Sequence, residues 1–319
     1  MSVKTLKDKD FLQLLPFFEN VRYNKFNRWG INHLSYLNYV IESSTKSGEV
    51  FVYKINNKII AILAFSLSPW DTNFYNINAG KINALWVDST INEQISEKAV
   101  RALLQAFQNF AYTIKLNFCF VSLGSWSNMI SRVIQENGFK YILSWADCYI
   151  GKRSMLKLPE GYNIGEIHPY EVEYIAHLAR DYFKGGRFYL DGNFPKDKVD
   201  QMYYELIMNS WKDPSCELAV LRNNENPVGA FICKSIKYPF SIEFIVRSLR
   251  LLVFDKDKSV PGLATAYIGE VANYLYAKYK CNLVVSGVEI HNLPSLIIHS
   301  KAGYKFNYTH NAYHWWANY

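Results

Sequence analysis

The chain has 319 residues, of which 50% are hydrophobic and 20% charged, and its formal net charge is +7. A chain of this length and composition can build a substantial hydrophobic core and has room for two domains of ordinary size. The sequence contains no lysine or arginine block of the kind that marks a nucleic-acid-binding tail, and no apolar run approaches the roughly 20 residues that span a bilayer. We therefore expect neither a nucleic-acid partner nor a membrane partner, and the oligomeric state is left open.

The N-terminus lacks a basic-then-apolar segment with a cleavage site, so we expect no signal peptide and a cytoplasmic location. The five cysteines are odd in number and irregularly spaced, which is typical of reduced core residues. The histidines have no third partner at metal-ligand spacing, so we expect no metal.

In chain order, the first clear element is a β-hairpin, and it recurs later. Asn56 and Asn57 separate two β-rich apolar runs, which is a strong hairpin signal. Two further apolar runs flank the polar segment 223–226 in the same way. The repetition predicts that the second half of the chain copies the first.

The spacing of later markers supports a duplication. An apolar strand ends at Asp88 and another at Asp255. Gly138 follows the first aspartate by 50 positions (138 − 88) and Gly303 follows the second by 48 (303 − 255), with a helix and an apolar strand between the markers each time. We expect two domains of related fold.

The strand that ends at Asp255 is followed by a turn of small residues and then by a helix over 267–278. Backbone N–H groups at the start of a helix have no intrahelical partner and lie at the positive end of the helix dipole. They can therefore hold a phosphate where small residues, here Gly262 and Ala264, let it come close. The alternative is that Gly262 only lets the chain turn.

After this loop come a helix, a strand over 282–288, Asn292, a short helix and the Gly303-Tyr304 turn. This order resembles the acetyl-CoA half of the GNAT superfamily of N-acyltransferases. There the fourth strand ends in an Arg/Gln-x-x-Gly-x-Gly/Ala loop that holds the CoA pyrophosphate, and an Asn after the fifth strand opens a helix closed by a Gly-Phe or Gly-Tyr turn. The resemblance covers residues 165–316 well and residues 1–150 faintly.

The resemblance implies an α/β fold with two tandem GNAT-like domains, each a mixed, mostly antiparallel sheet flanked by helices. A linker around 151–161 divides them into residues 1–155 and 156–319. The first domain has no glycine and two carboxylates after Asp88, where the phosphate loop would be. We expect CoA to bind only to the second domain.

Carried onto this sequence, the resemblance implies acetyl-CoA as cofactor and a set of residues that bind it. They are the strand residues Leu252, Val253 and Phe254, the loop residues Ser259, Val260, Gly262, Leu263, Ala264 and Thr265, and Asn292. Two positions depart from the family pattern. Ser259 stands where the family has Arg or Gln, and Pro261 has no N–H to offer a phosphate.

The family's usual general acid is a tyrosine before the Gly-Phe turn, and counting from Asn292 this position is His299. An imidazole can also give a proton to a leaving thiolate, so the resemblance implies His299 as the catalytic acid with altered pH behaviour. The alternative is a polar residue on a helix face. Glu289 or Glu243 could relay the amine proton, but no motif fixes either position, and we assign no base.

A glycine-rich segment over 184–195 precedes a second helix and contains Arg187, Phe188 and Asp191. It resembles the TDP-fucosamine N-acetyltransferases, which acetylate an amino group on a nucleotide-linked deoxysugar. Arg187 could bind a phosphate or carboxylate, and Asp191 could accept from a sugar hydroxyl or the amine. An ion pair between Arg187 and Asp191 is an equal alternative.

The resemblance thus implies an acetyl-CoA-dependent N-acetyltransferase that acts on a small-molecule primary amine. Two other functions stay open. Aminoacyl-tRNA-dependent transferases also carry tandem GNAT-like domains, although the phosphate loop and the lack of a basic coiled-coil insertion speak against them. The third candidate is a CoA-binding or interaction module whose catalysis has decayed.

Overall fold

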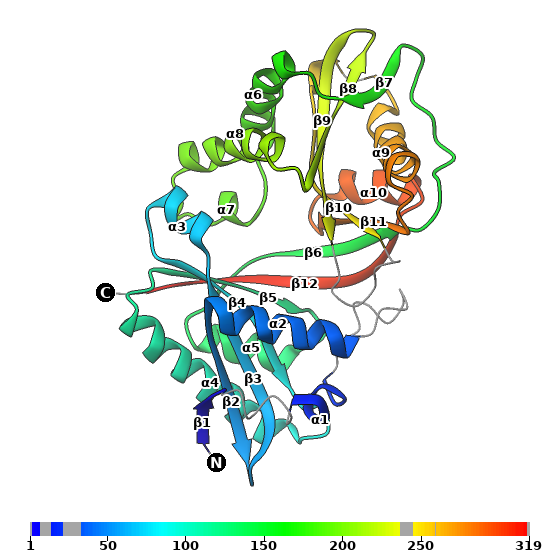
Figure 1. The fold of residues 1–319 in the computed structure, drawn as a ribbon. Helices are drawn as coiled ribbons and strands as arrows, with labels where there is room; N and C mark the ends of the chain where they lie inside the picture. The colour runs from blue at the N-terminus through cyan, green and yellow to red at the C-terminus, as the bar shows by residue number, and fades with distance from the viewer. Residues whose placement is uncertain (1, 7–13, 22–32, 237–244, 259, 318–319) are drawn as a thin grey trace. The chain divides into compact units, whose positions relative to one another are not determined.

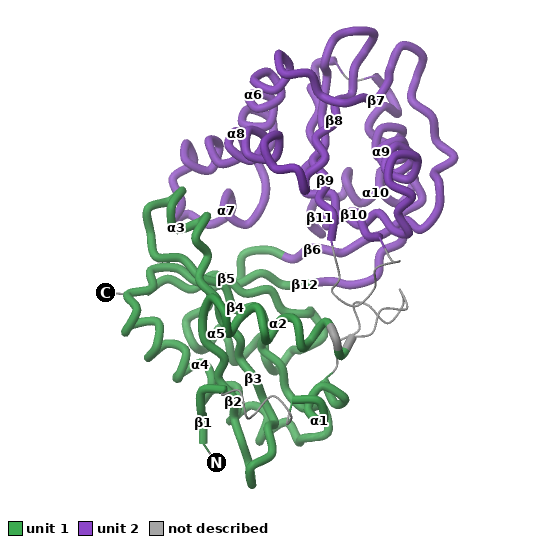
Figure 2. The backbone as a smooth tube through the Cα atoms, viewed as in Figure 1, with its two compact units in different colours: residues 1–143, 310–319 green, residues 144–309 purple. Residues whose placement is uncertain are grey.

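The computed structural model describes residues 2–6, 14–21, 33–236, 245–258 and 260–317 (Figure 1). The chain divides into two compact units (Figure 2). Unit 1 comprises residues 1–143 and 310–319, and unit 2 comprises residues 144–309. In the described part of the chain, no helix combines the length and the apolar character that crossing a membrane requires.

Unit 1 has one mixed sheet with strand order β1-β2-β3-β4-β5-β12, antiparallel except for the parallel pair β4 and β5. Its elements are β1 (Ser2–Thr5), α1 (Leu14–Phe18), α2 (His33–Ser47), β2 (Gly48–Ile55), β3 (Lys58–Leu67), α3 (Pro69–Tyr75), β4 (Ala79–Val87), α4 (Glu93–Thr113), β5 (Phe118–Gly124), α5 (Asn128–Glu136) and the end of β12 (Lys305–Trp316). Alternation along β3 sends Leu63 and Phe65 to the face under α4, and Ile62 and Ala64 to the face under α1 and α2. The sheet is therefore covered on both faces (Figure 1).

Unit 2 has a sheet of the same kind, with strand order β6-β11-β10-β9-β8-β7 and one parallel pair, β10 and β11. Its elements are β6 (Lys140–Ile150), β7 (Tyr162–Glu166), η3 (Pro169–Glu171), α6 (Val172–Tyr182), α7 (Arg187–Leu190), α8 (Lys196–Lys212), β8 (Cys216–Asn223), β9 (Asn226–Ile236), β10 (Val246–Phe254), η4 (Lys256–Lys258), α9 (Leu263–Tyr279), β11 (Leu283–Glu289) and α10 (Leu293–Lys301). Helix α9 begins at Leu263, earlier than the expected Tyr267.

The two units repeat the same hairpin down to its irregularity. Gly48 pairs with Ser66 and Cys216 pairs with Lys234, so one shift of 168 positions (216 − 48 and 234 − 66) superimposes the two ladders. Each ladder slips once, after Tyr53 in the first copy and at the matching place in the second. Because such bulges persist as backbone features, the shared slip supports the predicted duplication.

Two buried aspartates end corresponding strands in the same way. Asp88 accepts a hydrogen bond from the Thr90 N–H at 2.9 Å, and Asp255 accepts one from the Asp257 N–H at 3.0 Å. Each carboxylate therefore closes the turn that leads from the strand towards the next helix. Asp88 and Asp255 therefore make the same kind of hydrogen bond, in agreement with their predicted correspondence.

The two halves of the chain exchange their last strands. β6 follows the helices of the first half, yet its residues 145–150 pair with β11 in unit 2. β12 follows the helices of the second half, yet its residues 310–316 pair with β5 in unit 1. The units therefore differ from the expected division at 155/156, because each sheet ends in a strand from the other half of the sequence.

We predict that unit 1 depends on the last residues of the chain. Trp315 is buried in its core and its ring meets Phe107 edge-on, with centroids 5.8 Å apart. Trp315→Ala should lower the free energy of unfolding by about 3–5 kcal/mol, the usual effect of removing a large core side chain. Chemical denaturation combined with hydrogen exchange in α4 measures this.

Trp126→Ala is the matched control, because Trp126 is exposed. Its effect should be within about 1 kcal/mol of zero. Equal effects of the two substitutions would contradict the role of β12 in the core of unit 1.

Candidate active site

An unpaired stretch of sheet edge marks the site in unit 2. The parallel strands β10 and β11 pair only where residues 246–248 meet residues 283–285. Beyond that point, within the described residues, β10 pairs only with β9 and β11 only with β6. The β10 ladder also slips between Leu249 and Leu251, which inserts Arg250 as an extra residue and bends the strand. We call the facing edges 249–254 and 286–289 the notch.

The three predicted strand residues lie on the β10 side of the notch. Leu252 and Phe254 are half-buried, and Val253 points to the opposite face and is buried. In the ladder between β9 and β10, Gly229 pairs with Phe254. A Cβ atom at position 229 would lie 2.6 Å from the Val253 carbonyl oxygen. The edge of β10 that faces the notch keeps backbone groups available for an extended ligand.

The small-residue turn opens helix α9 without a side-chain cap. Gly262 is the N-cap residue with φ of 83°, and a Cβ atom there would meet nothing within 4 Å. The buried Leu263 donates its N–H to the Val260 carbonyl at 3.1 Å, whereas the N–H groups of Ala264 and Thr265 make no hydrogen bond to any described residue. Ser259 lies outside the described residues. The positive end of α9 is thus open towards free space.

Two tyrosines of α6 fix the segment between β10 and α9. The Tyr182 hydroxyl donates to Asp257 at 2.8 Å, and the Tyr174 hydroxyl donates to Asp255 at 3.4 Å. The hydrogen bond to Asp257 raises the pKa of Tyr182 to about 12, so the phenol stays a donor. Sequence reasoning missed both tyrosines, although they lie eight positions apart in the sequence and so share a face of α6.

The corresponding helix start in unit 1 is closed. The Asn92 side chain caps α4 by accepting from the Ile95 N–H at 2.9 Å. One turn later Glu97 pairs with Arg132 at 2.8 Å and with Arg101 at 2.7 Å, and these bonds lower the pKa of Glu97 to about 2. An anion at this end of α4 would meet a helix that is already capped by a side chain, whereas the start of α9 has no side-chain cap.

The glycine-rich loop is clamped to the end of β11. The Gly186 N–H donates to the Glu289 carboxylate at 2.6 Å, and the Tyr203 hydroxyl donates to the Gly185 carbonyl at 2.7 Å. Gly186 has φ of 87°, and a Cβ atom there would lie 2.7 Å from the Tyr203 oxygen. Gly186 is therefore favoured by its positive φ and its close approach to Tyr203, and Glu289 contacts the loop that sequence reasoning linked to the acceptor.

The predicted acceptor residues follow this clamp. Arg187 and Phe188 lie on the short helix α7, with the guanidinium carbon 4.3 Å from the centroid of the buried Phe188 ring. Asp191 is buried and accepts from both the backbone and the side-chain N–H groups of Asn193 at 3.0 Å. Asp191 thus holds the turn after α7, and Arg187 keeps a partly exposed cation beside it.

Asn292 and His299 lie on α10 as the family pattern requires. Asn292 is the N-cap and accepts from the Ser295 N–H at 3.1 Å. His299 is buried, and its Nδ1 lies 2.8 Å from the Ser295 carbonyl oxygen. Since a carbonyl only accepts, Nδ1 carries the proton of the neutral ring and Nε2 presents a lone pair. Burial lowers the pKa of His299, and the bond to Ser295 opposes the shift.

A second buried polar side chain lies beside this imidazole. The Tyr304 ring meets the His299 ring edge-on, with centroids 5.1 Å apart, and neither His299 Nε2 nor the Tyr304 hydroxyl has a partner among the described residues. In unit 1 the Phe139 N–H bonds to Ile134 as the Tyr304 N–H bonds to His299. Unit 1 therefore has apolar side chains where unit 2 has a titratable pair.

In the part of the chain that the structure describes, no group of three or more His, Cys, Asp or Glu side chains could hold a metal ion. All five cysteines are free and four of them are buried, as expected. Glu243, one of the two residues considered as a proton relay, lies outside the described residues.

Comparisons with known proteins agree on the fold. No protein-family model matches the chain. A spore coat polysaccharide biosynthesis protein, SpsD, of Bacillus subtilis is 20% identical over 82% of this chain and 86% of its own. A GCN5-related N-acetyltransferase from Sphaerobacter thermophilus matches with a TM-score of 0.63 at 10% identity, over 98% of this chain and 94% of its own.

Two further solved structures match. A tandem GNAT protein from the clavulanic acid biosynthesis pathway has a TM-score of 0.58 at 11% identity and covers 100% of this chain and 99% of its own. A GCN5-related glucosamine N-acetyltransferase region of a fungal β-N-acetylglucosaminidase has a TM-score of 0.61 at 12% identity, over 98% of this chain and 38% of its own. The expected α/β architecture of two tandem GNAT-like domains is thus confirmed.

We predict that Glu289 anchors the glycine-rich loop. Glu289→Ala removes the acceptor for the Gly186 N–H and should speed hydrogen exchange at that amide about tenfold or more, because a hydrogen bond to a charged group contributes about 1.5–3 kcal/mol. Glu289→Gln keeps a side-chain oxygen and should change exchange less. Exchange measured by mass spectrometry over residues 184–195 tests both.

Glu173→Ala is the control, because Glu173 is an exposed acid that accepts from Tyr204 on the same side of unit 2. It should leave the loop unchanged. Unaltered exchange at Gly186 in Glu289→Ala would mean that other contacts hold the loop.

Proposed function

We propose that the protein is an acetyl-CoA-dependent N-acetyltransferase whose active site lies in unit 2 and whose acceptor is a primary amine on an amino sugar, with nucleotide-linked sugars as the first candidates. The observation that carries the proposal is the uncapped start of α9 directly after the unpaired edge of β10. The other copy of the repeat has the same backbone but a capped helix. The cytoplasm, where acetyl-CoA is available, is the proposed compartment.

The residues around the notch fit this cofactor. Acetyl-CoA would supply the acetyl group as a thioester. The free N–H groups of Ala264 and Thr265 would bind its pyrophosphate, with Gly262 allowing close approach. The edge of β10 at Leu252–Phe254 would hold the pantetheine arm by backbone hydrogen bonds, as a strand edge holds an added strand. The net charge of +7 favours an anionic ligand.

The acceptor assignment is supported by the clamped loop and by two relatives. Arg187 offers a cation for a phosphate or carboxylate, and the buried Phe188 ring packs beneath its guanidinium group. The Bacillus subtilis relative is named for spore coat polysaccharide biosynthesis, and the fungal structure is described as a glucosamine N-acetyltransferase region. Amino sugars are therefore the acceptors to test first, in an assay that follows thiol release from acetyl-CoA.

The reaction forms a C–N bond and breaks a C–S bond, so the amine loses a proton and the leaving thiolate gains one. We propose His299 as the donor to the thiolate. With Nδ1 held by the Ser295 carbonyl, only the imidazolium has a proton on Nε2 to give. Glu289 is proposed as the residue that positions the acceptor loop, and the base stays unassigned.

Gly262→Val should weaken CoA binding by about tenfold or more, which corresponds to about 1.4 kcal/mol. A valine is strained at φ of 83°, and its side chain would project into the free space at the start of α9. Calorimetry with CoA on the full chain measures the dissociation constant.

Gly192→Val is the matched control, because a Cβ atom at Gly192 also meets nothing within 4 Å and no positive φ applies there. It should bind CoA like the unchanged protein. A folded Gly262→Val protein with an unchanged dissociation constant would move the phosphate site away from α9.

His299→Ala should lower kcat about a hundredfold or more and change CoA affinity little, because the proton is needed when the thiolate leaves. His299→Tyr should restore part of the activity. Turnover through the imidazolium falls as the pH rises through the lowered pKa of His299, while the tyrosine variant keeps its proton until about pH 10.

His291→Ala, at an exposed histidine next to Asn292, is the control and should leave the pH profile of kcat unchanged. Full turnover and an unaltered pH profile in folded His299→Ala would make His299 a structural residue and assign thiolate protonation to another group.

A further inference from the structure

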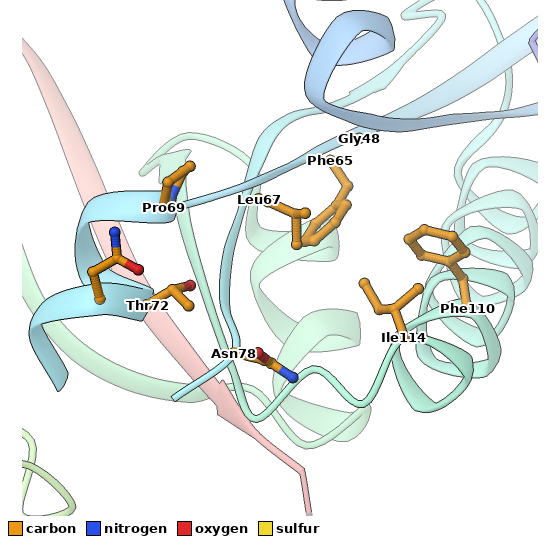
Figure 3. Close-up of a pocket in the computed structure, with 9 residues that line it drawn as sticks. Gly48, Phe65, Leu67, Pro69, Thr72, Asn78, Phe110 and Ile114 are labelled. Carbon is orange, nitrogen blue, oxygen red and sulfur yellow. The ribbon is translucent and has the colours of Figure 1, made fainter. Parts of the chain in front are cut away.

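Unit 1 contains a cavity of about 340 Å³ that the proposed function does not use (Figure 3). It lies where the end of β3, helix α3 and the last turns of α4 meet, and all of its lining residues belong to unit 1. Its volume is at the lower end of the range of about 300–1,000 Å³ found for small-molecule sites. The size suits one ligand ring rather than a cofactor as long as CoA.

The cavity is distinct from the place where the repeat would hold CoA. That place is the start of α4 at Glu93, whereas Phe110 and Ile114 line the cavity at the other end of the helix. The separation between Glu93 and Phe110 is about 25 Å at 1.5 Å per residue. The cavity is therefore no remnant of a cofactor site.

In the second copy of the repeat, the corresponding positions include charged side chains. The shift of 168 positions that superimposes the hairpins also superimposes the buried faces of α4 and α9. It carries Ala99, Val100, Leu103, Leu104 and Phe107 onto Tyr267, Ile268, Val271, Ala272 and Leu275.

By this shift Phe65 corresponds to Cys233, and Phe110 corresponds to Lys278. The Lys278 ammonium donates to Glu217 at 2.8 Å and to Glu166 at 2.7 Å. Unit 1 thus has the aromatic side chain of Phe110 beside the cavity where its duplicate has an ion-paired lysine.

The electrostatics of the cavity favour a neutral ligand. None of its lining residues carries a charge. It lies at the carboxyl end of α4, where the helix dipole is negative and disfavours phosphates and carboxylates. A cation would lose its hydration without gaining a carboxylate partner.

The walls combine an apolar surface with neutral polar groups. Phe65 and Phe110 meet edge-on with centroids 5.9 Å apart, and Leu67 and Ile114 face each other across the space (Figure 3). On the polar side, Thr72 Oγ1 accepts from the Ala79 N–H at 3.0 Å, which leaves its own hydroxyl proton to donate.

Asn78 supplies the complementary acceptor. Its side-chain N–H donates to the Lys115 carbonyl at 2.9 Å, and its backbone N–H donates to the Asn117 side chain at 2.8 Å. These bonds fix the amide and leave its carbonyl oxygen available beside the cavity. One donor and one acceptor are therefore held in place next to an aromatic and aliphatic surface.

We propose that this cavity binds a neutral sugar unit, with the C–H face of the ring against the partly exposed Phe110 and its hydroxyls bonded to Thr72 and Asn78. A sugar hydroxyl both donates and accepts, which matches the pair of groups present. A hydrocarbon occupant would offer neither group a hydrogen-bond partner. The proposal stands independently of acetyl transfer in unit 2.

The test is calorimetry and hydrogen exchange on the full chain with glucose, glucuronate and 1-hexanol as probes. Glucose should bind and protect residues 67–78 and 106–114, and glucuronate should bind at least tenfold more weakly. Leu67→Trp, which fills the space, should abolish this protection. Leu15→Trp is the control, because Leu15 is an equally exposed leucine elsewhere in unit 1.

Thr72→Val tests the same site without filling it and should weaken glucose binding about tenfold. Because it also removes the acceptor of the Ala79 N–H, Thr72→Ser, which keeps the hydroxyl, is its control and should bind glucose like the unchanged protein. Maltotriose distinguishes a free sugar from the end of a glycan: a dissociation constant below that of glucose assigns a glycan. Protection by 1-hexanol but not by glucose would overturn the proposal. Protection by glucose confined to residues 184–195 would also overturn it, and would leave the acceptor site of unit 2 standing.

Discussion

The structure depends on the pairing of each sheet's last strand, which comes from the other half of the sequence. Without β12, the edge of β5 would expose its backbone groups and the core of unit 1 would lose Tyr313 and Trp315. Without β6, unit 2 would lose Cys148 and Ile150 in the same way. Neither copy of the repeat is therefore complete as a continuous piece of sequence.

This exchange gives the fold many contacts between distant parts of the chain. Residues 118–124 of β5 can form this ladder only when residues 310–316, near the end of the chain, are present to pair with them. Closing a loop of that length is entropically unfavourable before the contacts form, so folding of unit 1 must await almost the whole chain. The duplicated halves are in this sense one cooperative molecule.

The two copies keep the same backbone and differ in the side chains that carry chemistry. Asp88 and Asp255 close the same turn, and the hairpin ladders slip at the same place. At the helix start that follows, however, the first copy has a capping asparagine and the second a bare glycine. The two copies have thus diverged at a helix start while keeping the turn that leads to it.

Local signals in the sequence predicted the elements with local causes. The Asn56-Asn57 hairpin follows from two residues that tolerate positive φ, and Gly262 does take the left-handed conformation at the start of α9. The partner strand of β6 and that of β12 could not be predicted. Both strands have equally suitable apolar faces, and nothing in the local sequence selects which strand each one pairs with.

The contacts of the candidate site were only partly predictable for the same reason. The family pattern placed Asn292 at a helix start and His299 on the following turns, and both lie there. It could not show that His299 turns Nδ1 to its own helix, or that Glu289 reaches the glycine pair 103 residues away along the chain. Such contacts depend on how strands and loops meet in space.

Helix α6 connects the segment before α9 to the glycine-rich loop. Its tyrosines hold the segment before α9, and the chain leaves its last residue, Tyr182, directly for the glycine pair of the acceptor loop. A ligand that shifted this helix would change the affinity of both loops at once. By thermodynamic linkage the effect would be reciprocal, so that occupancy of either loop would be sensed at the other.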